Sequence, residues 1–173
     1  HDRNHATGTF KDLAGTVVSS VLKENKVENF VGASTGNIGV AYSCYLAAAD
    51  INLYLFIPKI SIPSQESAIS SFGQNVMRVE GDYAGAKKMA KEFANKNDFV
   101  LTGGNFDPMR IEAKKTMVYE WLRLLPEFPT VFMQAISGGS GPIGVAKACE
   151  ELKDTGSFEA MPRMILPQPH RCS

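Results

Sequence analysis

Short apolar runs alternate with longer segments of helical periodicity along this chain. The clearest run, residues 51–57, is almost continuously apolar and ends at Pro58, which suits a strand buried on both faces. Before it, apolar residues at helical spacing predict a helix over residues 12–24: Leu13, Val17, Val18, Val21 and Leu22. Strands that alternate with helices form βαβ units around a mostly parallel sheet. We therefore expect an α/β fold in three layers, with helices flanking mostly parallel sheets.

The same pattern continues to the end of the chain. Further helices are expected over residues 37–49, 63–72, 83–96 and 143–152, and strands over residues 30–33, 74–79, 99–101, 130–136 and 164–166. A long helix begins at Asp107 and Pro108, where Asp caps the helix and Pro takes its first position. Its predicted inner face is Ile111, Val118, Leu122 and Leu125.

Composition excludes several classes of function. The chain has 173 residues with 18 basic and 18 acidic side chains, so it carries no electrostatic footprint for nucleic acid. No apolar run approaches the roughly 18 residues of a membrane span, and the first residues lack the apolar core of a secretion signal. Three widely spaced cysteines argue against a disulfide framework and a zinc site. We expect a cytoplasmic protein without a metal, acting on a small molecule.

Three polar or glycine-rich loops stand where ligands bind in such folds. In parallel sheets, ligands lie at the carboxyl ends of the strands, where loops lead into helices. Here those loops are residues 33–37, 102–105 and 137–142. A subdomain boundary is expected near Gly103 and Gly104, which divides the chain into residues 1–105 and 106–173.

The glycine loop at residues 137–142 lies between a predicted strand and a predicted helix. Its glycines let backbone N–H groups converge on an anion, and the helix dipole adds to the attraction, so phosphate is the natural ligand. A plain glycine-rich turn is the alternative. Gly139, Gly141 and Gly144 also fit a dinucleotide motif, but no acidic residue ends the next strand to hold the ribose. A nicotinamide-dependent oxidoreductase is therefore the second-ranked interpretation.

A lysine stands at the start of the first predicted helix. That end of the helix dipole disfavours a cation, and desolvation there favours the free amine that Schiff-base chemistry needs, so Lys11 is a candidate nucleophile. A solvated surface lysine is the alternative. Likewise, the polar residues 34–37 are either a helix cap or a site for a substrate carboxylate.

Four motifs together resemble the threonine synthase family, which belongs to the pyridoxal phosphate enzymes of fold type II. T-G-T-F-K-D at residues 7–12 is similar to the family's T-G-S-F-K-D, and A-S-T-G-N at residues 33–37 matches its A-S-T-G-N. D-P-M-R-I-E-A-K-K-T at residues 107–116 resembles N-P-x-R-x-E-G-Q-K-T. G-G-S-G at residues 138–141 stands where the family has its phosphate loop, and residues 162–168 resemble the strand after it.

The resemblance implies a role for each matching residue. Lys11 would form the Schiff base with pyridoxal 5′-phosphate and move protons at the substrate carbons. Asn37 would bind the 3′-oxygen of the cofactor, while its phosphate would lie on Gly138, Gly139, Ser140 and Gly141. Ser34 and Thr35 would hold the substrate carboxylate, and Arg110 the substrate phosphate. Asn105 falls in the pair of positions that helps to bind that phosphate.

The implied reaction releases phosphate from O-phosphohomoserine and adds water at the β-carbon to give threonine. Departures from the family lie at His5 and Ala6, at Ile38 in place of threonine, and at Gly104 and Asn105 in place of Asn-Ser. A β-replacement enzyme such as a cysteate-synthase-like enzyme acting on O-phosphoserine fits the altered pocket as an alternative. A non-catalytic relative that binds a phosphorylated metabolite or a protein is a third interpretation.

Family members are longer than this chain. The resemblance therefore implies that residues 1–105 are a small lobe with the Schiff-base lysine and the asparagine loop. Residues 106–173 would be the start of the lobe that binds the cofactor phosphate. The residue that faces the pyridine nitrogen would lie outside this chain, and a homodimer is the expected assembly.

Overall fold

The structure is a computed structural model that describes residues 4–34, 36–59, 61, 63–136 and 138–168. Its contacts divide the chain into two compact units, a first unit of residues 1–104 and a second unit of residues 105–173. The division falls one residue before the predicted boundary, so Asn105 belongs to the second unit. The roles assigned to the two lobes stay a prediction.

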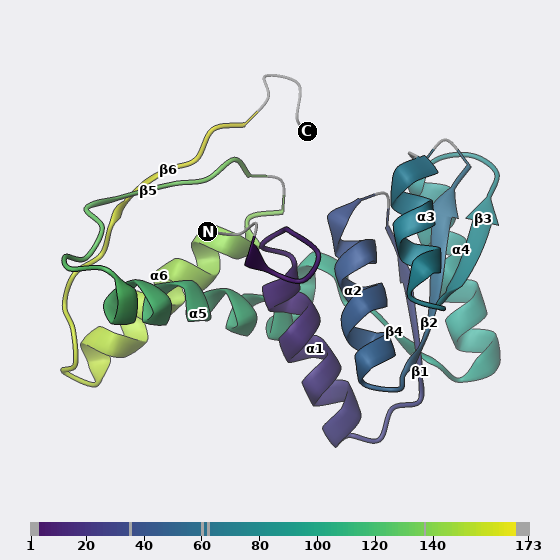
Figure 1. The fold of residues 1–173 in the computed structure, drawn as a ribbon, viewed down its shortest axis with the longest axis horizontal. Helices are drawn as coiled ribbons and strands as arrows, with labels where there is room; N and C mark the ends of the chain where they lie inside the picture. The colour runs from purple at the N-terminus through teal and green to yellow at the C-terminus, as the bar shows by residue number, and fades with distance from the viewer. Residues whose placement is uncertain (1–3, 35, 60, 62, 137, 169–173) are drawn as a thin grey trace. The chain divides into compact units, whose positions relative to one another are not determined.

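The first unit is a four-stranded parallel sheet with helices on both faces (Figure 1). Its elements are α1 (Asp12–Glu24), β1 (Asn29–Ala33), α2 (Asn37–Ala48), β2 (Asn52–Pro58), α3 (Pro63–Ser71), β3 (Asn75–Val79), α4 (Tyr83–Asn97) and β4 (Val100–Leu101). The strand order is β3-β2-β1-β4, and every pair is parallel. These bounds lie within one or two residues of the prediction.

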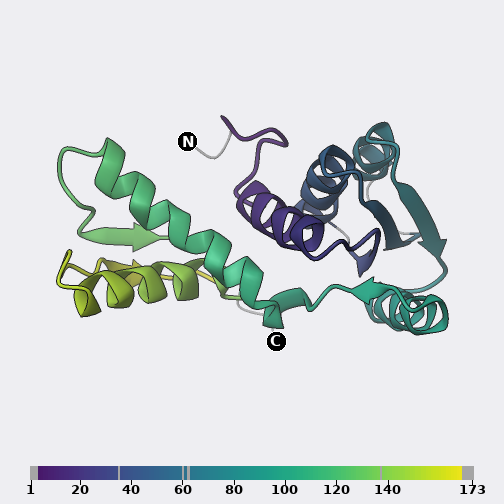
Figure 2. The ribbon, with the colours of Figure 1, turned by 90° about the horizontal axis from the view of Figure 1, so that it is seen from below.

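The apolar run of β2 explains the layering of this unit. Successive side chains of a strand point to opposite faces. Phe56 packs with Ala86, Ala90 and Ala94 of α4 in one core cluster, whereas Leu55 on the other face lies against Gly39 of α2. Figure 2 shows α4 across the sheet from α1, α2 and α3. The three-layer prediction is confirmed for this unit.

The second unit pairs two helices with a two-stranded parallel sheet. Its elements are α5 (Pro108–Leu124), β5 (Val131–Met133), α6 (Ser140–Asp154) and β6 (Arg163–Ile165), and a 3-10 turn, η2 (Gly104–Phe106), precedes them. Their shared core is a cluster of buried and half-buried side chains from both helices and both strands: Val118, Val145, Ala148, Cys149, Met117, Trp121, Phe132 and Met164. Asp107 caps α5 by accepting a hydrogen bond from the Met109 amide at 3.0 Å, as predicted.

Three predictions for this unit are wrong in detail. Strand β5 ends at Met133, three residues before the predicted end at residue 136. Helix α6 begins at Ser140, three residues before the predicted start at Ile143, because Gly139 adopts a left-handed cap with φ 73° and proline is tolerated in a first helical turn. The inner face of α5 is also different. Leu122 and Leu125 are 39% and 44% exposed, and the buried residues are Arg110, Ala113, Lys114 and Val118. Long basic side chains can bury their stems, which a stripe chosen by hydrophobicity overlooks.

Candidate functional site

Lys11 lies in a tight turn that leads into α1. Gly8 has φ 73°, which a side chain at that position would strain, and its amide donates to the His5 carbonyl at 2.9 Å. The Lys11 amide donates to the Thr9 hydroxyl at 3.2 Å. The Lys11 side chain is half-buried, with its ammonium nitrogen 4.5 Å from the centroid of the Phe10 ring. The predicted nucleophile therefore sits on a well-defined turn.

The loop between β1 and α2 holds the next group of predicted site residues. Ser34 is 3% exposed, and its hydroxyl accepts hydrogen bonds from the Gly36 and Gly39 amides, each at 3.1 Å. That hydroxyl therefore shapes the start of α2, and its contact with a substrate carboxylate stays a prediction. Asn37 is exposed in the first turn of α2, and Thr35 lies outside the described residues.

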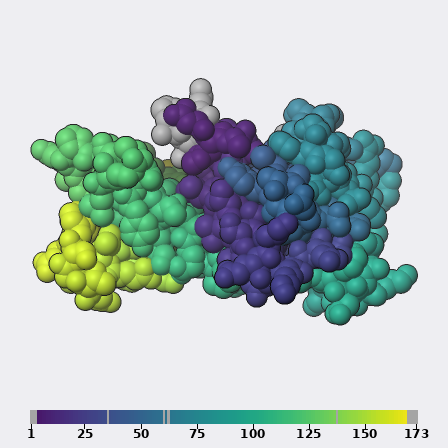
Figure 3. Space-filling view, turned by 60° about the horizontal axis from the view of Figure 1, so that its bottom comes forward, coloured from purple at the N-terminus to yellow at the C-terminus, as the bar shows by residue number. Residues whose placement is uncertain are grey.

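Helices α1 and α2 bring these two loops to one end of the first unit. Near the start of α1, Gly15 faces Ala41 and Tyr45 of α2. Near its end, the Lys23 ammonium donates to the Ala49 carbonyl, just past the last residue of α2, at 2.6 Å. The two helices therefore run in the same direction, and Figure 3 shows them side by side on one face of the unit. The turn of Lys11 and the loop of Asn37 consequently share the end at which both helix dipoles are positive.

The glycine loop of the second unit is packed closely against two side-chain amides. At Gly138, an added Cβ would collide with the side-chain amide of Asn105, and at Gly141 with that of Gln134. Ser140 and Gly141, both buried, form the start of α6, where amides have no acceptor within the helix. A glycine-rich cradle of backbone amides at the positive end of a 15-residue helix fits a phosphate group.

Arg110 lies at the same end of the second unit as this loop. Helix α6 passes α5 closely at Gly144, which faces the Ile111 carbonyl, and the two helices are joined further along by the Lys115–Glu151 ion pair at 2.7 Å. They therefore run in parallel, with both N-termini together. Arg110 is 8% exposed, and within the described part of the chain its Nε has no hydrogen-bond partner. An unsatisfied buried guanidinium donor favours an anionic ligand.

The family of the chain follows from a match over its whole length. A family model described as "Pyridoxal-phosphate dependent enzyme" matches residues 1–173. The chain belongs to the pyridoxal-phosphate dependent enzyme family. Its cofactor is pyridoxal 5′-phosphate, as predicted, and the cradle at Gly138 to Gly141 fits the cofactor's phosphate. The match includes Gly139, Gly141 and Gly144, so the nicotinamide interpretation of those glycines is wrong.

Relatives in this family include two kinds of synthase. Cysteate synthase of Methanothrix thermoacetophila is 30% identical over 169 residues, which cover 96% of this chain and 41% of that protein. Threonine synthase of Mycobacterium leprae is 26% identical over 161 residues, which cover 92% of this chain and 44% of that protein. The chain thus spans less than half the length of these curated relatives.

Solved structures of other family enzymes share the fold. Threonine deaminase isoform 2 from Solanum lycopersicum matches with a TM-score of 0.80 and 17% identity, covering 97% of this chain and 45% of that chain. Maize serine racemase matches with a TM-score of 0.79 and 20% identity, covering 95% and 49%. At such identities the likeness concerns the fold alone, and it confirms the fold type II prediction.

A cluster of four charged side chains, two from each helix, joins α5 to α6. Lys115 pairs with Glu112 at 2.5 Å and with Glu151 at 2.7 Å, and Lys147 also contacts Glu112. Hydrogen bonds from Lys115 and then Lys147 lower the pKa of Glu112, and hydrogen bonds to Glu112 and Glu151 raise the pKa of Lys115. Lys114 is 1% exposed. Lys114 and Lys115 therefore do not form a solvated face of α5.

Gln134 is a neighbour of the glycine loop that motif reasoning missed. It follows β5, its amide donates to the Ile165 carbonyl at 3.1 Å, and its side chain lies against Gly141. The available signal was a polar side chain in the middle of an apolar segment, residues 130–136. Among the described residues, no three His, Cys, Asp or Glu side chains lie together as metal ligands, and none of the described helices is long and apolar enough to cross a membrane.

Proposed function

We propose that the protein containing this chain is a carbon–oxygen lyase that releases phosphate from an O-phospho amino acid, with O-phosphohomoserine as the first candidate substrate. The overall reaction takes O-phosphohomoserine and water to threonine and inorganic phosphate. One C–O bond breaks at the γ-carbon, and a new one forms to water at the β-carbon.

The cofactor and this chain divide the work. Pyridoxal phosphate, when bound, supplies an electron sink for charge that develops at the substrate carbons. Lys11 holds the cofactor through its amine and moves protons at the α-carbon of the substrate. Asn37 holds the ring oxygen, while Gly138, Gly139, Ser140 and Gly141 hold the cofactor phosphate with the positive end of α6.

The observation that best supports a phosphorylated substrate is Arg110. A guanidinium with a buried, unpartnered Nε has already lost its water, so a phosphate oxygen that accepts from it recovers a charge-assisted hydrogen bond. Asn105, which lies against Gly138, offers an amide at the same end of the second unit. Both residues support binding of the substrate phosphate.

A cysteate-synthase-like replacement on O-phosphoserine is the second candidate. A relative named cysteate synthase is 30% identical over nearly the whole chain. Ile38 in the first turn of α2 also removes the hydroxyl that threonine synthases carry there. Both candidate substrates carry a phosphate ester, so we expect Arg110 to bind the phosphate of either one.

Phosphate release by the full-length protein tests the proposal. O-phosphohomoserine and O-phosphoserine, the latter with and without sulfite, are compared as substrates. Lys11→Ala should abolish release from both while the circular dichroism spectrum is kept. Arg110→Gln should raise KM by about 10- to 100-fold, as expected for loss of a hydrogen bond to a charged group worth roughly 1.5–3 kcal/mol.

Arg163→Gln, at an exposed position of β6, is the matched control and should leave KM unchanged. Release of phosphate by Lys11→Ala at the wild-type rate would remove the assignment of Lys11. An unchanged KM in Arg110→Gln would remove the phosphorylated substrate.

A further inference from the structure

Asp12, the residue after the lysine, is buried and closes the turn on itself. It is 1% exposed, although it is a carboxylate. One carboxylate oxygen accepts from the Thr7 amide at 2.7 Å, and the other accepts from the Thr7 hydroxyl. Both carboxylate oxygens of Asp12 therefore accept hydrogen bonds from Thr7, which lies five positions earlier in the chain. The chain between them, which carries Lys11, forms a ring closed by charge-assisted hydrogen bonds.

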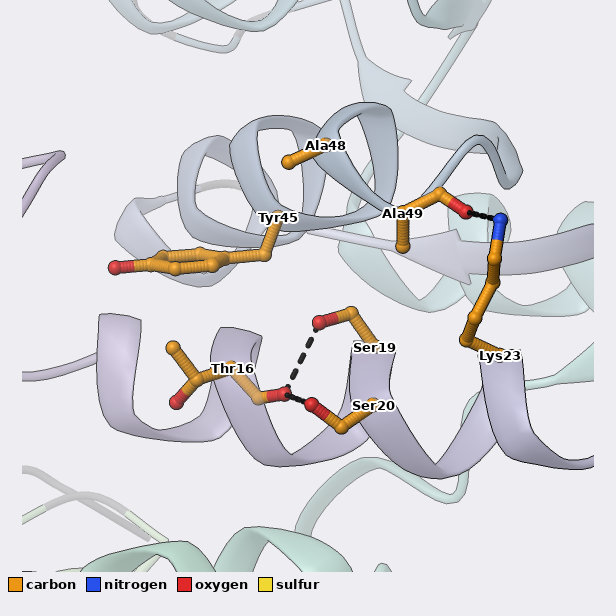
Figure 4. A pocket seen from close by; sticks show the side chains of 7 residues that line it. All are labelled: Thr16, Ser19, Ser20, Lys23, Tyr45, Ala48 and Ala49. Atoms are coloured by element: carbon orange, nitrogen blue, oxygen red, sulfur yellow. Dashed lines mark hydrogen bonds between the residues drawn. The ribbon is translucent and has the colours of Figure 1, made fainter.

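Tyr45 of α2 packs against α1 at Gly15, three residues after Asp12. Gly15 lets its ring approach, since a Cβ at that position would lie 2.5 Å from a Tyr45 ring carbon. Figure 4 shows the ring between α1 and α2, at one end of a hollow of about 270 Å³, with the hydroxyl directed toward the start of α1. Burial first, and then the charge of Asp12, raise the pKa of the Tyr45 phenol.

We infer that Asp12 and Tyr45 are positioning residues that brace the turn of Lys11 against α2. This inference rests on the proposed role of Lys11. Asp12 closes the turn through Thr7, and Tyr45 connects it to the helix whose first residue is Asn37. The brace therefore fixes the lysine relative to the loop proposed to hold the cofactor ring. Neither residue touches the reacting atoms.

The brace predicts how fast the cofactor is captured at Lys11. The full-length apoprotein is mixed with pyridoxal phosphate, reduced with borohydride at timed intervals, and the label on Lys11 is measured by peptide mass spectrometry. Asp12→Asn places an amide donor opposite a Thr7 donor, Thr7→Val removes one donor at constant shape, and Tyr45→Phe removes only the hydroxyl. Each should slow labelling on the order of 10-fold or more, because catalytic geometry is sensitive to displacements of about 1 Å.

Matched variants separate positioning from general destabilisation. Thr7→Ser restores the hydroxyl and should label within about twofold of wild type. Asp50→Asn, at the opposite end of α1 and α2, should do the same. Hydrogen exchange of the apoprotein should rise in residues 4–12 of Thr7→Val and Asp12→Asn, and stay unchanged in α4.

The outcomes distinguish this inference from the proposed function. Wild-type protein that carries no label on Lys11 would overturn the proposed function itself. Wild-type labelling together with equal rates in Thr7→Val, Thr7→Ser and Tyr45→Phe would overturn the brace alone. If Asp12→Asn does not fold, the valine–serine pair at position 7 and Tyr45→Phe decide the question.

Discussion

At the scale of single residues, the cluster of Glu112, Lys115, Lys147 and Glu151 links the stability of the second unit to pH. Glu112 is 34% exposed and accepts from two lysines, Lys115 and Lys147. Hydrogen bonds from these lysines lower its pKa, so the folded state favours the ionised carboxylate. A carboxylate with a lowered pKa contributes stability that is present above its ordinary pKa and is lost as the pH falls through the folded value.

Glu112→Gln should therefore destabilise the folded protein at pH 7 and not at low pH. We expect about 1 kcal/mol at pH 7, allowing for solvent screening at a carboxylate that is one-third exposed. The difference from wild type should shrink as the pH falls below about 4. Urea unfolding followed by circular dichroism at several pH values measures it. Glu120→Gln, which breaks the exposed pair with Arg123, is the control and should leave the unfolding midpoint where it is.

At the scale of elements, glycine decides how closely two helices approach. At Gly144 of α6, an added Cβ would lie 2.8 Å from the Ile111 carbonyl and would also strike the Lys114 side chain. At Gly85 of α4, the nearest atom would be a carboxylate oxygen of Asp82 at 3.6 Å, an ordinary contact. Gly144 therefore allows α6 to pack closely against α5, whereas Gly85 is not needed for the packing of α4.

Alanine at these two glycines should have opposite effects on stability. Gly144→Ala should lower the free energy of unfolding by about 1–3 kcal/mol, because backbone atoms of α5 cannot move aside. Gly85→Ala should raise it by up to about 1 kcal/mol, through helix propensity and reduced freedom of the unfolded chain. Thermal melts of both variants test the pair. A stable Gly144→Ala protein would show that α5 and α6 can separate at low cost.

At the scale of the whole molecule, the sequence predicted the bounds of helices and strands better than the burial of their side chains. Helix α1 has the predicted bounds, and Pro63 and Pro108 open α3 and α5 as expected, since proline and capping residues act locally. Burial depends on partners far along the chain. Lys114 is buried because Gly144 allows α6 to pass over it, and no local pattern contains that information.

The site shows the same division between local motifs and distant contacts. Local motifs and the family resemblance singled out Lys11, Asn37, Arg110 and the glycine loop as candidates, and the structure places each of them at the start of a helix. The parallel course of α1 and α2, which gathers two of these at one end, follows from contacts such as Gly15 with Tyr45. The local cap formed by the Ser34 hydroxyl was weighed from the sequence, and the structure shows it.

Thiol reactivity should report the integrity of the two cores. Burial, and then the charge of Glu150, raise the pKa of Cys149, and burial followed by Asp12 raises that of Cys44. In a Cys172→Ser background, a thiol reagent at pH 8 should modify native Cys149 roughly 100-fold more slowly than in urea. Cys44, which is half-buried, should react sooner than Cys149. Equal rates in native and unfolded protein would contradict the buried position of Cys149.

The packing of Trp121 against Phe128 and Phe132 has a practical consequence. It is the single tryptophan of the sequence, and it belongs to the second unit. Indole emission is thus a native optical label for residues 105–173, free of signal from the sheet that follows Lys11. Excitation at the red edge of the tryptophan absorption band therefore follows the unfolding of the second unit without an added dye.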